Sequence, residues 1–485
     1  MSEMNKMLVT YESFGAVGDG VTDDMAAICA AHEYANENGL DVRANDGATY
    51  YIGGKALTAT IKTNVNFGTA KFIIDDRELE KIHLPIFVVA TDYPTYTPEI
   101  KTLSKGQKHI DFPHEGRTYV RVFNSSNLIF RRKGENANKG VDTSDCFVVG
   151  ADGSIENRIN YDYPEITKAY ARCVEDEPIV IEGGIFTTIA NRHERVYKYH
   201  HRGFSILRSN TLVKNIKHYI EGEGEDGAPY SAFFGITDAV DVTISDCLLT
   251  PHKTYRTKDS NETYVNNMGT YELGFAASIG TRLIRVTQSR DIADTRYWGL
   301  IGTNFCKDMY IEDCEMSRFD AHMGVTNATI KNSRIGHQCL SLIGYGDFYI
   351  ENSYVIGYSF LALRGDYGSH WDGSFTAKNC TWEPKNGGCN RIVNAANSGD
   401  HDFGYISRMP ESIVIDGLKI LDSKFDTGTD YFILPNYDAG FAPDKPFPYV
   451  PTKKLVARGI TSESGRSVVV YEREDQYPEL SCEVE

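Results

Sequence analysis

Short stretches of alternating apolar and polar residues recur along most of the chain. From about residue 175 onward many share one pattern: a β-branched or apolar residue, a free position, usually Asn or Asp, then a small residue. The instances are "VKNI" from Val213, "ISDC" from Ile244, "VTQS" from Val286, "IEDC" from Ile311, "IKNS" from Ile330, "IENS" from Ile350 and "AKNC" from Ala377. The last five begin 25, 19, 20 and 27 residues apart. Such a period is typical of the coils of a parallel β-helix, so the pattern predicts one elongated all-β solenoid.

The aligned repeats also predict which residues stack from coil to coil. The Asx positions, which tolerate a tight corner and can bond one another in a ladder, are Asn215, Asp246, Asp313, Asn332, Asn352 and Asn379. The small residues that follow them are Cys247, Cys314, Ser333, Ser353 and Cys380. With coils ~4.8 Å apart, Cys314 and Cys380 would be ~14 Å apart, beyond disulfide reach. The cysteines are therefore predicted to be reduced core residues.

The N-terminal segment contains one helix signal. In "FGAVGDGVTDD" a glycine turn precedes Thr22, a predicted N-cap, and places Asp23 and Asp24 in the first helical turn. Ile28 and later apolar residues recur at helical spacing, and Gly39 supplies the stop. The acidic residues are therefore predicted to start a helix of about four turns and to play no catalytic part.

This segment, with "ATYYI" and "TNVNFGTAKFII" after it, resembles the N-terminal module of the pectin-lyase-like superfamily, which includes polygalacturonase-type glycosidases, lyases and phage tailspikes. The resemblance implies a right-handed parallel β-helix whose open end is covered by the helix. The expected organisation is an N-terminal cap over residues 1–60, coils over 61–425, and a C-terminal tail over 426–485 that packs on the coils. The sequence lacks the catalytic motifs of the polygalacturonases and pectate lyases, so their site residues cannot be transferred.

The composition of the chain limits the kinds of molecule that it is expected to bind. The formal net charge of −17 argues against nucleic acid or an anionic membrane as partner and favours a neutral or weakly charged ligand. The start, "MSEMNKMLVTYESFG", lacks the apolar segment of a secretory signal, so a cytoplasmic location is expected. The ten cysteines show no paired metal-type spacing, and neither a metal nor a cofactor is predicted.

The candidate catalytic residues come from one column of the alignment. Asp320 lies nine residues after its repeat anchor, level with Cys339 and Ser359, and counting backward places Glu272 and Tyr297 in the same column. Alternation in "RFDAHMG" directs Arg318, Asp320 and His322 outward. Glu272 and Asp320 would lie ~10 Å apart, so their carboxyl groups could be ~6.5–9.5 Å apart, as in an inverting glycosidase.

Binding residues are predicted around this column. His337 lies beside Arg318 on the next coil, and the insertion "LRGDYGSHWDG" carries Arg364, Asp366, His370 and Trp371. An indole ring beside charged groups suits sugar recognition, by stacking on the pyranose ring and by bonding its hydroxyls. The alternative for both groups is structural, as a solvated charge ladder or a loop that packs on the coils.

Three functions remain open at this point. The favoured prediction is a glycoside hydrolase that cleaves an oligosaccharide, with Asp320, His322 and Glu272 as catalytic residues and Arg318, His337, Tyr297, Arg364, Asp366, His370 and Trp371 as binding residues. One alternative is a polysaccharide lyase or epimerase that acts on a uronate glycan. The other is a phage tailspike or adhesin that binds a glycan, with association of the chain into a dimer or trimer.

Overall fold

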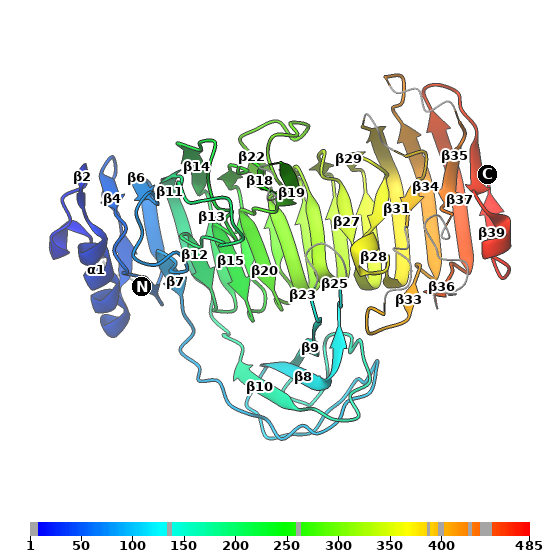
Figure 1. Ribbon diagram of the computed structural model, residues 1–485. Coiled ribbons are helices and arrows are strands. Elements are labelled where there is room, and N and C mark those ends of the chain that lie inside the picture. Colours follow the sequence, from blue (N-terminus) through cyan, green and yellow to red (C-terminus); the bar gives the residue numbers. More distant parts are fainter. Residues whose placement is uncertain are drawn as a thin grey trace, which may run out of the picture. The chain divides into compact units, whose positions relative to one another are not determined.

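The computed structural model describes residues 8–132, 138–258, 263–385, 389–395, 402–424, 429–436 and 449–485. The chain forms two compact units. Unit 1 comprises residues Met1–Tyr93, Val174–Ala276 and Arg282–Gly302, and unit 2 comprises Pro94–Cys173, Ala277–Thr281 and Thr303–Glu485. Each unit contains stacked coils of short strands (Figure 1).

The coils of unit 1 form three ladders of parallel strands. The first ladder comprises β1 (Leu8–Thr10), β3 (Asp41–Arg43), β6 (Val65–Asp75), β11 (Ile179–Ile189), β13 (Thr211–Lys214), β16 (Thr243–Ser245) and β21 (Arg282–Ile284). The second comprises β2 (Asp19–Asp23), β4 (Thr49–Ile52), the later parts of β6 and β11, β14 (Lys217–Glu221), β17 (Leu248–Leu249) and β22 (Thr287–Gln288). The third comprises β5 (Ala59–Ile61), β7 (Phe87–Val89), β12 (Phe204–Ile206), β15 (Phe234–Thr237) and β20 (Leu273–Ala276). A hairpin of β18 (Tyr255–Lys258) and β19 (Tyr264–Met268) is antiparallel.

The coils of unit 2 repeat this parallel pairing. Their strands are β23 (Ile301–Glu312), β24 (Glu315–Met316), β25 (Phe319–Lys331), β26 (Arg334–Ile335), β27 (Leu340–Leu342), β28 (Gly344–Glu351), β29 (Tyr354–Gly357), β30 (Leu361–Leu363), β31 (Trp371–Pro384), β32 (Val393–Asn394), β33 (Ser407–Arg408), β34 (Ser412–Ile420), β35 (Tyr431–Leu434), β36 (Tyr449–Val450), β37 (Lys454–Ser462), β38 (Val468–Tyr471) and β39 (Ser481–Val484). Parallel pairs run from β25 through β28, β31, β34 and β37 to β39. The ladder therefore continues to residue 484, beyond the predicted end of the coils at 425. Part of the predicted wrapping tail, residues 425–428 and 437–448, lies outside the described residues.

Unit 2 also contains an antiparallel sheet that the sequence analysis missed. It consists of β8 (Thr118–Ile129), β9 (Val141–Val149) and β10 (Lys168–Cys173), and it has an apolar core of its own that includes Val120, Phe147 and Ile159. The predicted coil range of 61–425 made no allowance for this sheet, because alternation has a period of two residues in both kinds of strand. The sheet is the cyan and green group labelled β8, β9 and β10 in Figure 1.

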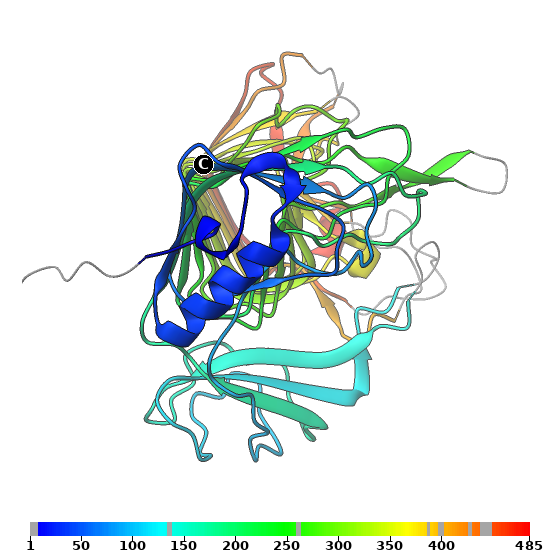
Figure 2. The ribbon, with the colours of Figure 1, turned by 90° about the vertical axis from the view of Figure 1, so that its left-hand side faces the viewer.

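The predicted N-terminal helix is present as α1 (Met25–Asn38), which lies across the end of the unit 1 coils (Figure 2). It begins three residues after the predicted N-cap, Thr22. Asp24 occupies the N-cap position, and its carboxylate accepts hydrogen bonds from Val17 N–H at 2.7 Å and Gly18 N–H at 3.1 Å. Gly39 ends the helix with φ of 62°, as predicted. The prediction that Asp23 and Asp24 lie in the first helical turn is wrong, because both precede the helix. Asp24 stabilises the turn before it, and Asp23 Oδ1 accepts the N–H of Met25, the first helical residue, at 3.1 Å.

The predicted corner column is confirmed. Its members all adopt the left-handed conformation, with φ between 48° and 57°: Asn215, Asp246, Asp313, Asn332, Asn352 and Asn379. Asn352 Nδ2–H donates to Asn332 Oδ1 at 3.3 Å, which is one step of the expected ladder. The small residues that follow the corners are buried, and Cys314 N–H donates to Ser333 Oγ at 3.0 Å. These corners keep successive coils in register.

Substitution at a corner tests this role. Asn352→Ala should lower the free energy of unfolding by about 1–2 kcal/mol, because a left-handed φ is costly for alanine and the bond to Asn332 is lost. Asn352→Gly is the matched control, because it loses the same bond but adopts the conformation without strain. Denaturant unfolding should rank the parent above the glycine variant and the glycine variant above the alanine variant. Equal midpoints for the two variants would show that backbone strain at the corner is unimportant.

Candidate functional site

Five of the predicted site residues come together in unit 2. Arg318 directly precedes β25, and Asp320 and His322 lie at its start. Arg364 and Asp366 lie just after β30, beside and in the short helix η2 (Gly365–Tyr367). The register explains this meeting, because Asp320 pairs with Ser341 and Ser341 pairs with Ala362, two residues before Arg364.

Two aspartates and two of these arginines form the centre of the cluster. Arg364 donates from Nη1 to Asp320 Oδ1, and from Nη2 to Asp366 Oδ2 at 2.8 Å. Arg318 Nη2 lies 3.1 Å from Asp320 Oδ2. The Asp320 side chain is only 1% exposed, whereas that of Asp366 is 35% exposed. The prediction of a solvent-facing Asp320 is therefore wrong: the residue points away from the coil core, but the arginines cover it.

A third arginine comes from the segment that follows β8 of the inserted sheet. Arg132 Nη2–H donates to Asp366 Oδ2, and its guanidinium carbon lies 4.7 Å from the centroid of the Tyr367 ring. Sequence reasoning missed Arg132 and Tyr367. Arg132 and Asp366 are 234 positions apart in the sequence, and no local pattern indicates that they meet.

The cluster holds more positive than negative charge. Among the ion pairs of the described residues, Arg132, Arg318 and Arg364 against Asp320 and Asp366 give 3 − 2 = +1. Burial raises the pKa of Asp366, but the guanidinium groups of Arg364 and Arg132 outweigh burial, so its pKa is lowered overall. Asp366 is thus held as a carboxylate.

His322 is the neutral member of the cluster. Burial, followed by the positive charge of Arg364, lowers the pKa of His322 to about 4. Its Nδ1 lies 3.1 Å from Asn304 Oδ1, so a neutral imidazole donates its N–H there and keeps the lone pair on Nε2. The ring lies 5.7 Å from that of Tyr367, edge to face. At neutral pH the site therefore combines a neutral imidazole with surplus guanidinium charge.

Two predicted binding residues are core residues. Trp371 is 0% exposed, its ring packs against Phe348 and Phe375, and its Nε1–H donates to Gly346 O at 2.9 Å. His370 is buried and accepts the backbone N–H of Arg408 on Nδ1 at 3.1 Å. The prediction that these side chains stack on or bond a sugar is wrong, because β31 begins at Trp371 and directs this ring into the coil core.

The predicted column is also corrected near His337. This residue is buried in the turn between β26 and β27, where its carbonyl accepts the Lys385 ammonium at 3.0 Å. The residues of that turn shift the count, so Ser341 and Ala362 follow Asp320 in its column in place of Cys339 and Ser359. The His337 side chain is therefore buried in this turn, which does not suit the predicted role of binding a ligand.

Glu272 lies in unit 1, inside a buried group of ion pairs. His252 Nε2 lies 3.0 Å from Glu272 Oε1, and His218 Nδ1 bonds Glu272 Oε2. Burial raises the pKa of Glu272, but His218 and then His252 outweigh burial and lower it to about 2. The side chain is 1% exposed. Like Asp320, Glu272 is enclosed by bonded side chains of its own unit. The pairing of these two carboxylates around a water stays a prediction.

The buried ion pairs around Glu272 are linked to Tyr297 through Glu223 and Arg290. His252 Nδ1 lies 3.2 Å from Glu223 Oε1, and Arg290 Nη2 lies 3.9 Å from Glu223 Oε2. Arg290 Nη1–H donates to the Tyr297 hydroxyl at 2.7 Å. Glu272 and Tyr297, which the sequence placed in one column, are therefore joined by a chain of polar contacts.

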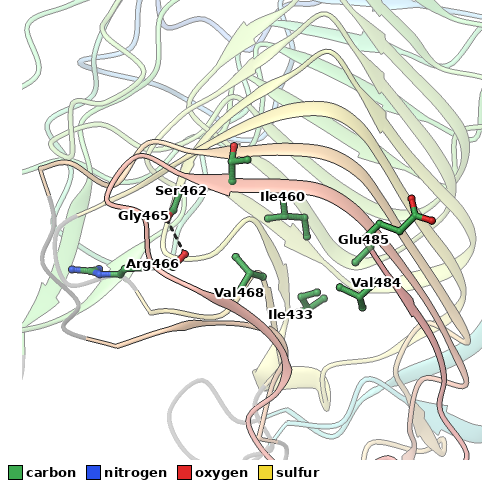
Figure 3. Close-up of a pocket in the computed structure, with 10 residues that line it drawn as sticks. Ile433, Ile460, Ser462, Gly465, Arg466, Val468, Val484 and Glu485 are labelled. Carbon is green, nitrogen blue, oxygen red and sulfur yellow. Dashed lines mark hydrogen bonds between the residues drawn. The ribbon is translucent and has the colours of Figure 1, made fainter.

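A pocket of about 440 Å³ lies among the last coils of unit 2 (Figure 3). Its lining is largely apolar, with Ile433, Ile460, Val468 and Val484, and it includes none of the predicted site residues. Within the described ranges, no three His, Cys, Asp or Glu residues are grouped to hold a metal ion. No described helix is long and apolar enough to cross a membrane.

The buried charge of His252 predicts a pH dependence of stability. Burial lowers its pKa, but Glu223 and Glu272 outweigh burial and raise it to about 9. This stabilisation is complete below the unfolded pKa of about 6.5 and is lost as the pH rises through 9. Denaturant unfolding should therefore show stability falling by a few kcal/mol between pH 6.5 and 9. His252→Gln should remove most of this decline, and His109→Gln, at an exposed position, should keep it; an unchanged decline in His252→Gln would contradict the assignment.

Comparison with known proteins identifies the fold. No family model and no curated protein matches the chain. Among solved structures, the tailspike gp61 of Pseudomonas phage phi297 aligns with a TM-score of 0.53 at 13% identity, over 94% of this chain and 81% of that chain. The tailspike gp49 of Pseudomonas phage LKA1 aligns at 12% identity over 98% and 78%, with a TM-score of 0.46. The Gp54 tailspike of Acinetobacter baumannii phage AP22, solved with a capsular saccharide, aligns at 9% identity over 98% and 79%, also with 0.46.

Identities this low are informative about the fold alone. The parallel ladders of both units agree with the alignment to the phi297 tailspike, which spans most of the chain. The chain therefore has the right-handed parallel β-helix fold that its sequence predicts.

Proposed function

We propose that the chain is a carbohydrate-active enzyme that acts on a uronate glycan at the unit 2 cluster, as a lyase or an epimerase. The observation that carries this proposal is the combination of a neutral His322 with three arginines around two carboxylates. A uronate sugar has a carboxylate next to C5, and removal of the C5 proton requires a base and stabilisation of that carboxylate.

His322 and the arginines suit these two roles. Nε2 of the neutral imidazole takes the C5 proton, while the surplus guanidinium charge near Asp366, the more exposed carboxylate, stabilises the negative charge that moves onto the sugar carboxylate. In elimination, the C5–H electron pair becomes the C4–C5 double bond, the C4–O bond breaks, and the departing oxygen takes a proton. In epimerisation, a proton returns to the opposite face of C5.

The geometry gives less support to the glycoside hydrolase predicted from the sequence. A hydrolase of the predicted kind needs one carboxyl group that keeps its proton at working pH and a second that is ionised. The pKa of Asp366 and that of Glu272 are both lowered, and Asp320 lies between two guanidinium groups. None of the three is suited to donate a proton to a glycosidic oxygen.

Glycan binding without turnover is the second candidate. The phi297 neighbour is a tailspike, and a cluster with surplus arginine charge would also suit the binding of an acidic glycan. Binding of a uronate oligomer without any change in the oligomer would favour this class. The cytoplasmic location and the association of chains into dimers or trimers remain predictions.

Substitution of His322 tests the proposed base. Against polygalacturonate and polymannuronate, His322→Gln should lower turnover by about 10²–10⁴-fold while leaving uronate binding nearly intact, because the amide can keep a bond to Asn304 but cannot take the proton. In the parent, activity should rise as pH increases through about 4, where the imidazole loses its proton. Formation of the unsaturated product, followed by ultraviolet absorbance, measures elimination. Near-parental turnover in His322→Gln would contradict the role.

Arg132 offers a test with a neighbouring control. Arg132→Gln should raise KM about tenfold or more for a uronate substrate, because the surplus positive charge is lost. It should also move the acidic limb of the pH profile upward, because the Arg132 charge helps to lower the pKa of His322.

Arg131→Gln is the control, because Arg131 pairs with the largely exposed Asp402 and contacts no member of the cluster among its described ion pairs. Its KM and pH profile should match those of the parent. If the two variants have the same KM, Arg132 does not bind the substrate.

A further inference from the structure

The inserted sheet of unit 2 is joined to the coils by a buried ion pair that the proposed function does not use. Lys307 Nζ of β23 contacts Asp145 Oδ1 of β9, and both side chains are only 1% exposed. We propose that Lys307 and Asp145 are positioning residues, which dock the sheet on the coils and so hold Arg132 beside Asp366. The inference rests on the proposed binding role of Arg132, but the docking itself can be tested without a substrate.

Each partner of the ion pair makes a further bond to the segment between β9 and β10. Lys307 Nζ–H also donates to the carbonyl of Arg158. Asp145 Oδ2 accepts the backbone N–H of Asn160 at 2.7 Å. Removal of one partner from a buried ion pair leaves the other charge without compensation, which is costly. The docked position of the sheet should therefore become less stable when Lys307 loses its charge.

A short stretch of β23 holds both sides of the candidate site. Asn304 Oδ1 lies 3.1 Å from His322 Nδ1. The ring of Phe305, the next residue of β23, lies 5.7 Å from that of Phe130, which is two residues before Arg132. The ion pair lies on the same strand, two residues further along the chain. The proposed base and the arginine from the inserted sheet are thus placed relative to one strand.

The pairing of β8 with β9 connects the ion pair to Arg132. Asp145 lies opposite Val122 of β8, and the two strands stay paired, with one bulge, as far as Ile129, three residues before Arg132. The sheet has an apolar core of its own, so it should stay folded when it detaches from the coils. Loss of the ion pair should therefore withdraw Arg132 from Asp366 without unfolding the sheet.

Three further contacts between the sheet and the coils are hydrogen bonds. They join Asn157 to Asp308 at 2.6 Å, Asn160 to Thr326 at 2.8 Å and Tyr161 to Tyr345 at 2.5 Å. Water can replace hydrogen bonds of this kind at a modest net cost. Removal of the ion pair should therefore be enough to loosen the sheet.

Cys146 is a natural probe of the docking. It directly follows Asp145, it is 1% exposed, and its thiol donates to the carbonyl of Phe305 at 3.4 Å. Burial raises the pKa of this thiol to about 12, so it should react slowly with iodoacetamide while the sheet is docked. Mass spectrometry of the cysteine peptides would measure its alkylation rate. Cys380, a buried residue of β31 in the same unit, would report on unfolding of the coils.

Lys307→Met should speed the alkylation of Cys146 about tenfold or more and leave that of Cys380 unchanged, because the sheet detaches while the coils stay folded. Lys331→Met is the matched control. Lys331 lies on β25 and pairs with Glu351 at 3.6 Å, where both side chains are partly exposed, so its loss should leave Cys146 unchanged.

Enzyme kinetics separate a positioning role from a merely structural one. With a uronate substrate, Lys307→Met should raise KM about tenfold and leave kcat nearly unchanged, as expected for loss of the Arg132 contact. The double variant Lys307→Met/Arg132→Gln should have the KM of Arg132→Gln alone, because both changes remove one contact. A structural role independent of Arg132 would give effects on KM that multiply.

The proposal is overturned if Cys146 in a folded Lys307→Met chain is alkylated at the parental rate, or if the two effects on KM multiply. If Lys307→Met does not fold, Asp145→Asn keeps the size of the side chain and removes its charge, and the same results decide. Absence of uronate turnover in the parent would contradict the proposed function, whereas the alkylation rates would still test the docking.

Discussion

The structure depends on one backbone constraint, the left-handed corner that ends a strand in each coil. Asn and Asp adopt this conformation at low cost and keep the next strand in register with the one before. Because the register holds, Asp320, Ser341 and Ala362 form one column, and Arg364 arrives beside Asp320 although 44 residues separate them. The candidate site is thus a consequence of coil stacking.

Local charge, and not the charge of the whole chain, sets the chemistry of that site. A net charge of −17 favours a neutral ligand on average, yet three arginines around two aspartates leave the cluster positive. Arg364 and Arg132 hold Asp366 ionised and, together with burial, favour the neutral form of His322. One set of ion pairs therefore disfavours acid catalysis by a carboxyl group and favours a histidine base.

The sequence was informative where the signal was local and repeated. The corner residues, the buried small column and three residues of the unit 2 cluster follow from a period of about twenty residues and from alternation. The other two predicted members, Arg364 and Asp366, come from an insertion that lengthens one coil. The place of Arg132 in the cluster could not be predicted from the sequence, because an inserted sheet with a core of its own brings this residue to Asp366. Trp371 was misassigned because composition alone does not say whether an indole ring faces the core or the solvent, and a turn near His337 shifted the column count.

The mass of the product of a uronate oligomer tests the central claim, that the site removes a proton instead of donating one to a glycosidic oxygen. With the oligomer and the chain in deuterated water, elimination gives a fragment lighter by one water than a hydrolysis fragment, and epimerisation gives an uncleaved oligomer that contains deuterium at C5. The account predicts one of these two results. Fragments with the full mass of hydrolysis products, or an oligomer that is bound but unchanged, would contradict it.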